Sequence, residues 1–156
     1  MTEQKLQTYI DNYTSTDFDR IKLVWNGKYG QDFVDDNYDF RMQVCEFVVP
    51  QIDKVNIELI CDLYLETAKT SPLTFSVYNK FHLFADELLK RGGTDYLLDY
   101  IRGASQSMDT GMSSGRLTIS KEQAKNLLEL QKVCTHFQNG KNTSPQDLPR
   151  ILLMIF

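Results

Sequence analysis

The 156-residue chain has no apolar stretch near the roughly 18 residues that a membrane-spanning helix needs. Its first residues, TEQKLQTYIDNYT, are polar and lack the charged-then-apolar plan of a secretory signal. We therefore expect a soluble, cytoplasmic protein. With 42% hydrophobic residues, residues 1–156 can form a single compact domain.

Cysteine and histidine are both scarce. The cysteines Cys45, Cys61 and Cys134 are widely spaced within apolar helical patterns, which argues against a disulfide framework and against a zinc site. We expect them to be buried free thiols. His82 lies on an apolar helical stripe, where a core histidine is commoner than a ligand. A nucleophilic pair of His82 with Cys45 or Cys61 is an alternative that no sequence motif supports.

Clustered basic residues are also missing. The net charge is −4, and the acid is concentrated in the first half of the chain. Residues 1–70 hold 13 acidic and 7 basic residues, whereas residues 71–156 hold 8 acidic and 10 basic residues. This distribution argues against direct nucleic-acid binding and favours a basic partner, with a merely solvated acidic face as the alternative.

Helix start and stop signals are strongest in residues 71–93. Ser71 can cap a first turn, Pro72 suits the first helical position, and Gly92 can adopt a left-handed conformation after the last turn. Apolar residues three and four apart fill the interval and cover much of the helix circumference. We therefore expect residues 71–93 to be the central and most enclosed helix.

Neighbouring segments also have helical signals. Asn56 can cap a helix that ends just before Ser71, so this helix and the central one should form a helical hairpin. An apolar stripe predicts another helix over residues 35–48, which Pro50 ends because proline disfavours the helical conformation in the residue before it.

In the second half, composition predicts a break in the helical pattern, and a local motif predicts a further helix start. Residues 103–115, GASQSMDTGMSSG, are rich in glycine and serine and predict a flexible loop. Ser120 and Gln123 have the spacing of a capping box, which predicts a helix after Ser120. The expected fold is all-α, a single compact domain of about six to eight helices built around a central helical hairpin.

One local pattern points to function. In QDFVDDNYDF, residues 31–40, four carboxylates alternate with three aromatic rings. Aspartates accelerate the encounter with a basic partner, and tyrosine and phenylalanine provide interface anchors. We therefore predict an exposed partner-binding surface made of Asp32, Phe33, Asp35, Asp36, Tyr38 and Asp39.

The same residues allow two other interpretations. Asp35, Asp36 and Asp39 match the aspartate-rich pattern by which prenyl-chain enzymes hold magnesium on one helix face. This chain has no second such motif, and it is far shorter than those enzymes. They also suit a solvated loop and helix start. The unique Trp25 is expected to pack in the core, but an exposed Trp25 close to residues 32–39 would be a candidate interface anchor.

A small, acidic, mostly helical chain with its acid beside aromatics in DFVDDNYDF resembles the immunity proteins of bacterial contact-dependent growth inhibition systems. The resemblance lies in composition and helical plan. It implies a cytoplasmic inhibitor that binds one cognate toxin protein, commonly a nuclease, and blocks its active site or substrate surface. From the residues themselves we expect no catalytic residues, metal or cofactor, and no direct contact with nucleic acid or membrane. The alternatives are a small magnesium-dependent helical enzyme and a helical adaptor that docks through the apolar residues 151–156. The oligomeric state stays open.

Overall fold

The computed structural model describes residues 2–120, 122, 123 and 125–127. These residues form helices and no β-strand, which confirms the all-α fold class. The α-helices in this part of the chain are α1 Glu3–Asp11, α2 Tyr38–Val48, α3 Ile57–Thr74, α4 Phe81–Glu87, α5 Leu97–Ala104 and α6 Met108–Ser114. Shorter elements are the 3-10 helices η1 Ser15–Arg20, η2 Gly30–Asp32 and η3 Val49–Lys54 and the π-helical η4 Leu88–Gly92. Among the described residues, none of the helices combines the length and the apolar composition that a membrane-spanning segment requires.

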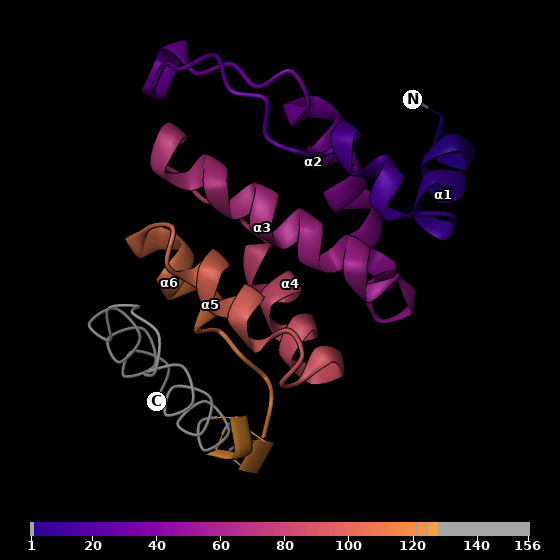
Figure 1. Cartoon of the computed structure of the whole chain (residues 1–156), viewed down its shortest axis with the longest axis vertical. Helices are drawn as coiled ribbons and strands as arrows, with labels where there is room; N and C mark the ends of the chain where they lie inside the picture. The colour runs from indigo at the N-terminus through magenta and orange to yellow at the C-terminus, as the bar shows by residue number, and fades with distance from the viewer. Residues whose placement is uncertain (1, 121, 124, 128–156) are drawn as a thin grey trace, which may run out of the picture.

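The α3 helix is the centre of the fold. In Figure 1 it crosses the middle of the molecule, with α1 and α2 on one side and α4, α5 and α6 on the other. Asn56 caps it as predicted, because its side-chain oxygen accepts a hydrogen bond from the Glu58 backbone N–H at 2.9 Å. Both layers pack on α3, whose fully buried residues include Leu59, Ile60, Leu63, Tyr64 and Ala68.

Tyr64 connects α3 to the second layer. Its ring stacks on Phe81 of α4, with ring centroids 4.6 Å apart, and lies parallel to Tyr100 of α5 at 6.3 Å. Its hydroxyl donates to the Tyr100 carbonyl at 2.9 Å and bonds to the Ser114 hydroxyl at 2.8 Å. A central helical hairpin therefore exists, formed by α3 and α4.

The boundary predicted for that hairpin is wrong. Residues 71–93 are not one helix, because Ser71 and Pro72 lie in the last turns of α3, which ends at Thr74. The chain then leaves the helix at Phe75, with φ +56°, and α4 begins only at Phe81. Pro72 lies inside α3, where it lacks the N–H that would bond to the Ala68 carbonyl, and α3 ends two residues later. The serine–proline pair favours a helix start by local preference alone, and the structure places it at a helix end instead.

The predicted flexible loop over residues 103–115 is also wrong, because this segment is the end of α5, a turn and α6. Ser107 and Thr110 cap α6 reciprocally, with the Thr110 N–H donating to the Ser107 hydroxyl at 3.1 Å and the Ser107 N–H donating to the Thr110 hydroxyl at 2.9 Å. A Cβ at Gly103 would lie 2.2 Å from the Tyr64 ring. The small residues thus allow close packing rather than a loop.

Other predicted boundaries are confirmed. The α2 helix ends at Val48, as predicted, but it begins at Tyr38 rather than at residue 35, and the 3-10 helix η3 follows it directly through Pro50. Ser120 and Gln123 form the capping box, with the Ser120 N–H donating to the Gln123 side chain at 3.0 Å and the Gln123 N–H donating to the Ser120 hydroxyl at 3.1 Å. Cys45 and Cys61 are buried free thiols.

Candidate partner-binding surface

Residues 22–37 form an arm between η1 and α2, with η2 at its tip near the end of α3 (Figure 1). Its two halves pair through an isolated antiparallel bridge between Trp25 and Asp35. The Asn26 N–H also donates to the Val34 carbonyl at 3.0 Å. The arm is therefore a short hairpin-like segment with its own backbone pairing.

The turn of the arm depends on two glycines and one asparagine. Gly27 and Gly30 have φ values of +82° and +64°, a conformation that favours glycine, and they bracket the turn. The Asn26 side chain donates to the Asp32 carbonyl at 2.9 Å and accepts from the Lys28 N–H at 3.1 Å. These bonds hold the tip in one conformation.

Asp35 does not belong to the exposed surface that the sequence predicted. Its side chain is fully buried and forms an ion pair with the equally buried Arg41 of α2. The Asp35 carboxylate also accepts from the backbone N–H groups of Val24 at 2.9 Å and Asn37 at 3.1 Å. Arg41 in turn donates to the Ile21 carbonyl at 3.0 Å. This buried pair fixes the base of the arm to α2, so Asp35 has a structural role.

The other five predicted residues lie at or near the surface. Asp32, Asp36 and Asp39 are exposed. Tyr38 is 40% exposed, and its ring meets the half-buried ring of Phe33 edge to face at 6.4 Å. The surface therefore contains the predicted carboxylates and rings, with the exception of Asp35.

Several exposed apolar side chains lie next to these residues, and of these the sequence indicates only Trp25, as an alternative to its place in the core. Trp25, expected in the core, is 36% exposed and packs edge to face on Tyr29, which is 58% exposed, with ring centroids 5.0 Å apart. Phe75 lies against Gly30, where a Cβ would be 3.7 Å from its ring. We call Trp25, Tyr29 and Phe75 the arm patch. Val34 is also exposed, but it precedes Asp35, the bridge partner of Trp25, and therefore faces the opposite side of the arm from Trp25.

Phe75 is the least expected member of the arm patch. It is 74% exposed and has φ +56°, a left-handed conformation that is strained for a bulky residue. Neither burial nor backbone preference accounts for phenylalanine at this position. An exposed ring held in this way suits contact with another molecule.

Asp39 also lines a groove of about 530 Å³ between α1 and α2. Glu3 and Glu46 add two further carboxylates, of which Glu46 forms an ion pair with Lys80. Hydrogen bonds from Lys80 and Tyr78 lower the pKa of Glu46, which keeps it ionised. The groove is therefore acidic and includes the apolar side chains of Leu6, Met42 and Phe47.

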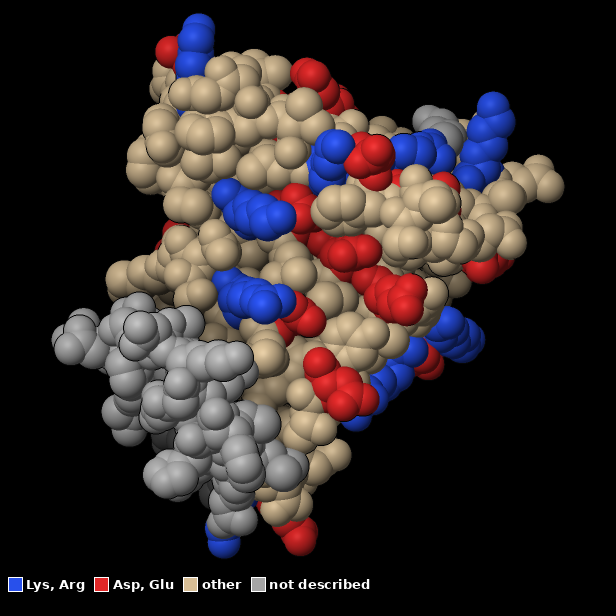
Figure 2. All heavy atoms as spheres, in the orientation of Figure 1, with Lys and Arg blue, Asp and Glu red and all other residues tan. Residues whose placement is uncertain are grey.

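Part of the acidic excess stabilises the fold instead. Figure 2 shows acidic side chains along the middle of one face, over α3. Asp62 accepts a hydrogen bond from the Tyr13 hydroxyl at 2.6 Å, and the buried Glu66 accepts one from the Leu23 N–H at 2.8 Å. Burial raises the pKa of Asp62 despite the Tyr13 hydrogen bond, and the negative charge of Glu66 raises it further. The Glu66 contact ties the start of the arm to α3.

The geometry does not favour the catalytic alternatives. In the described ranges, no group of three or more histidine, cysteine or acidic side chains is placed to hold a metal ion. The Asp35 carboxylate already forms an ion pair with Arg41. Burial raises the pKa of both Cys45 and Cys61 to about 12, so these thiols are protonated near neutral pH. Cys134 and residues 151–156, the expected docking segment of an adaptor, lie outside the described residues.

Comparisons of the chain with protein-family models, with curated proteins and with solved structures each find no match. Function is therefore inferred from the residues of this chain.

Proposed function

We propose that this chain is a protein-binding domain that recognises a basic partner through the arm patch and the carboxylates beside it. The exposed Trp25–Tyr29 ring pair on the arm is the observation that carries this proposal. Tryptophan and tyrosine are enriched among the residues that dominate binding energy, and each such anchor contributes about 2 kcal/mol or more on truncation to alanine.

The charges next to the patch favour a basic partner. Asp32, Asp36 and Asp39 are exposed, and Glu3 adds a further carboxylate in the groove between α1 and α2, whereas the charge of Glu46 is neutralised by Lys80. Exposed charges act over about 8 Å at physiological salt, so these carboxylates chiefly accelerate association. The rings would then slow dissociation.

The arm is also preorganised. Its base is held by the buried Asp35–Arg41 pair and by the Glu66 contact with Leu23, and its tip by the Asn26 side chain. A binding segment that is already ordered loses less conformational entropy on association. This supports recognition of one partner rather than folding upon binding.

The finer proposal is that the partner is a basic toxin in the cytoplasm, which this chain neutralises as an immunity protein does. Enzymes that act on nucleic acids need a basic surface for phosphates, and an acidic inhibitor with aromatic anchors can cover such a surface. The magnesium enzyme is not proposed, because Asp35 is buried away from the exposed Asp36 and Asp39.

Site-specific photo-crosslinking tests the proposal. A photoreactive phenylalanine derivative replaces Tyr29, or, as the control, Gln106, which is exposed in the turn between α5 and α6. Irradiation in an extract of the native cell should link one basic protein to position 29 and not to position 106, and unlabelled wild-type chain should compete. Crosslinking of the same proteins from both positions, or of none, contradicts the proposal.

The immunity role has a separate test. Production of the captured protein alone should arrest growth of a host cell, and coexpression of this chain should restore growth. Coexpression of the Trp25→Ala/Tyr29→Ala variant should restore it poorly. If the captured protein is harmless to the host, the immunity role is contradicted, and the proposal that this chain is a protein-binding domain still stands.

A further inference from the structure

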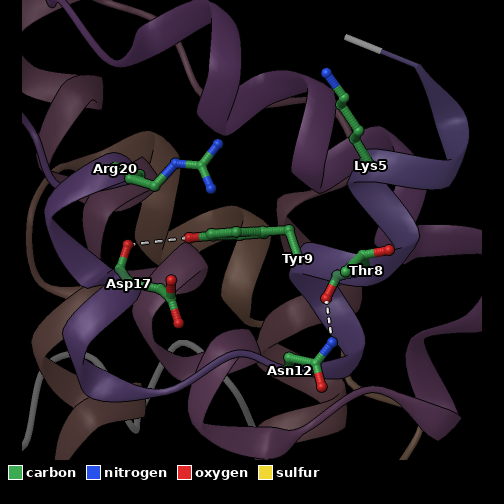
Figure 3. Close-up of a pocket in the computed structure, with 6 residues that line it drawn as sticks. All are labelled: Lys5, Thr8, Tyr9, Asn12, Asp17 and Arg20. Carbon is green, nitrogen blue, oxygen red and sulfur yellow. Dashed lines mark hydrogen bonds between the residues drawn. The ribbon is translucent and has the colours of Figure 1, made fainter.

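A hollow of about 410 Å³ lies between α1 and η1, on the N-terminal layer of the molecule (Figure 3). In Figure 3 the Arg20 guanidinium lies over the Tyr9 ring, and the Lys5 side chain extends from α1 on the other side of the opening. Its lining residues are Lys5, Thr8, Tyr9 and Asn12 from α1 and Asp17 and Arg20 from η1.

Arg20 is held in place by aromatic faces rather than by a carboxylate. Its guanidinium carbon lies 4.7 Å from the centroid of the Tyr9 ring and 4.4 Å from that of Phe40. Within the part of the chain that the structure describes, its side chain makes no ion pair and no hydrogen bond. Because the Tyr9 and Phe40 rings lie at 76° to each other, a guanidinium that lies flat on one ring turns one edge toward the other. Its five N–H donors have no protein acceptor among the described residues, so the edges that do not face a ring are free to bind a ligand.

Lys5 adds a second cation to the hollow, and it too makes no ion pair with a described residue. Asn12 uses one of its two amide hydrogens on the Thr8 carbonyl at 2.9 Å, which leaves the other available. The hollow therefore gathers unused donors from three side chains, two of them positively charged.

Asp17 limits how negative a ligand can be. Its carboxylate accepts from the Thr14 N–H at 3.1 Å and from the Thr14 hydroxyl at 3.1 Å, which caps η1. In Figure 3 its carboxylate points away from Arg20, while its backbone carbonyl accepts a hydrogen bond from the Tyr9 hydroxyl at 3.2 Å. The hollow thus has two cations and one carboxylate in its lining.

From these contacts we infer that the hollow between α1 and η1 binds an oxyanion, the carboxylate or phosphate group of a small molecule, through the Arg20 guanidinium with Lys5 as a second cation. Guanidinium groups bind both oxyanions through two parallel N–H donors. The volume exceeds that of a bare ion, so the group is carried on a larger molecule. This site does not depend on the arm patch or on the proposed partner.

Nuclear magnetic resonance titration of the whole chain tests the inference. Three probes are used: inorganic phosphate, phenyl phosphate and benzoate. Binding should shift the side-chain N–H signal of Arg20 and the backbone signals of α1 and η1. Saturation by phenyl phosphate alone assigns a phosphate ligand, and saturation by benzoate alone assigns a carboxylate ligand.

Variants separate binding from general charge. Arg20→Gln should lower the affinity for the tightest-binding probe at least tenfold. Arg20→Lys should recover only part of this affinity, because lysine lacks the two parallel N–H donors of a guanidinium. Lys28→Gln removes an exposed charge on the arm and should leave affinity unchanged. Asp17→Asn keeps an acceptor for the η1 cap but removes the opposing charge, so it should tighten binding several-fold. Circular dichroism verifies that each variant is folded.

Two results would overturn the inference. The first is the absence of saturable shifts at α1 and η1 with all three probes, which would leave Arg20 as a packing residue on Tyr9 and Phe40. The second is an equal loss of affinity in Arg20→Gln and Lys28→Gln, which would reduce the effect to unspecific charge attraction.

Discussion

Removing the Asp35 carboxylate should destabilise the fold strongly. In Asp35→Ala the Arg41 guanidinium stays fully buried without its counter-charge, and the N–H groups of Val24 and Asn37 lose their acceptor. Breaking a buried ion pair by deleting one partner costs about 3–5 kcal/mol. Because domains of this size are stable by roughly 5–15 kcal/mol, the variant should keep only a small margin or unfold.

Urea unfolding measures this loss, followed by far-ultraviolet circular dichroism and by the emission of Trp25, the only tryptophan in the chain. Circular dichroism reports the helices, and Trp25 reports the arm. The matched control is Asp36→Ala, the exposed neighbour, which should change the free energy of unfolding by at most about 0.5 kcal/mol. The two aspartates are adjacent in sequence, so composition and local charge are nearly identical in the two variants.

A double variant keeps the test informative if Asp35→Ala does not fold. Asp35→Ala/Arg41→Met removes both charges, and replacing a buried pair by apolar groups is often close to neutral, so much of the loss should be recovered. A loss below about 1 kcal/mol in Asp35→Ala, or equal losses in Asp35→Ala and Asp36→Ala, would refute the assignment of Asp35 to the interior.

Three further predictions concern the core. The pKa of Asp62 is raised above its ordinary value of 3.8, so the folded state binds a proton more tightly than the unfolded state does. The stability that this proton contributes is present at low pH and is lost as pH rises. In urea unfolding, Asp62→Asn should therefore become more stable relative to wild type as pH is raised from about 4 to about 7. Cys45 and Cys61 should resist thiol reagents at pH 8 in the native state, because both thiols are buried and protonated, and should react at once in urea. Mass spectrometry of the labelled peptides measures the reaction of each cysteine separately. Gly103→Ala should destabilise by about 1–3 kcal/mol in thermal unfolding, because the added methyl overlaps the Tyr64 ring; an unchanged melting temperature would contradict this contact.

Features whose cause lies within a few residues could be predicted from the sequence. Asn56 caps α3, and Ser120 and Gln123 bond reciprocally, because each of these interactions spans at most three residues. The end of α2 lies close to Pro50 as predicted, but the predicted cause is absent, because Val49 keeps helical dihedral angles and η3 continues directly from it.

The position of the central helix could not be predicted from local signals. Pro72 lacks an N–H whichever helix end it occupies, and only packing against both layers makes residues 57–74 the enclosed helix. The Ser107–Thr110 cap uses threonine where the capping-box pattern expects glutamate or glutamine, so the sequence pattern predicts no helix start at Ser107.

The candidate site was predicted in part for the same reason. Exposure of Asp32, Asp36 and Asp39 follows from their polarity alone, whereas burial of Asp35 depends on Arg41 and on the backbone of a segment that precedes it by more than ten residues. Phe75 comes close to the arm only because α3 ends beside Gly30. These contacts are set by the tertiary fold.

The affinity of the basic protein captured at position 29 tests the proposed function most directly. Calorimetry compares wild type, Trp25→Ala/Tyr29→Ala and the control Leu98→Ala, which removes an exposed apolar side chain from α5. Loss of two aromatic anchors should weaken binding by about 3 kcal/mol or more, roughly a hundredfold or more, without change in Leu98→Ala. Wild-type affinity in the double variant, with the fold intact, would contradict a partner-binding role for the arm patch.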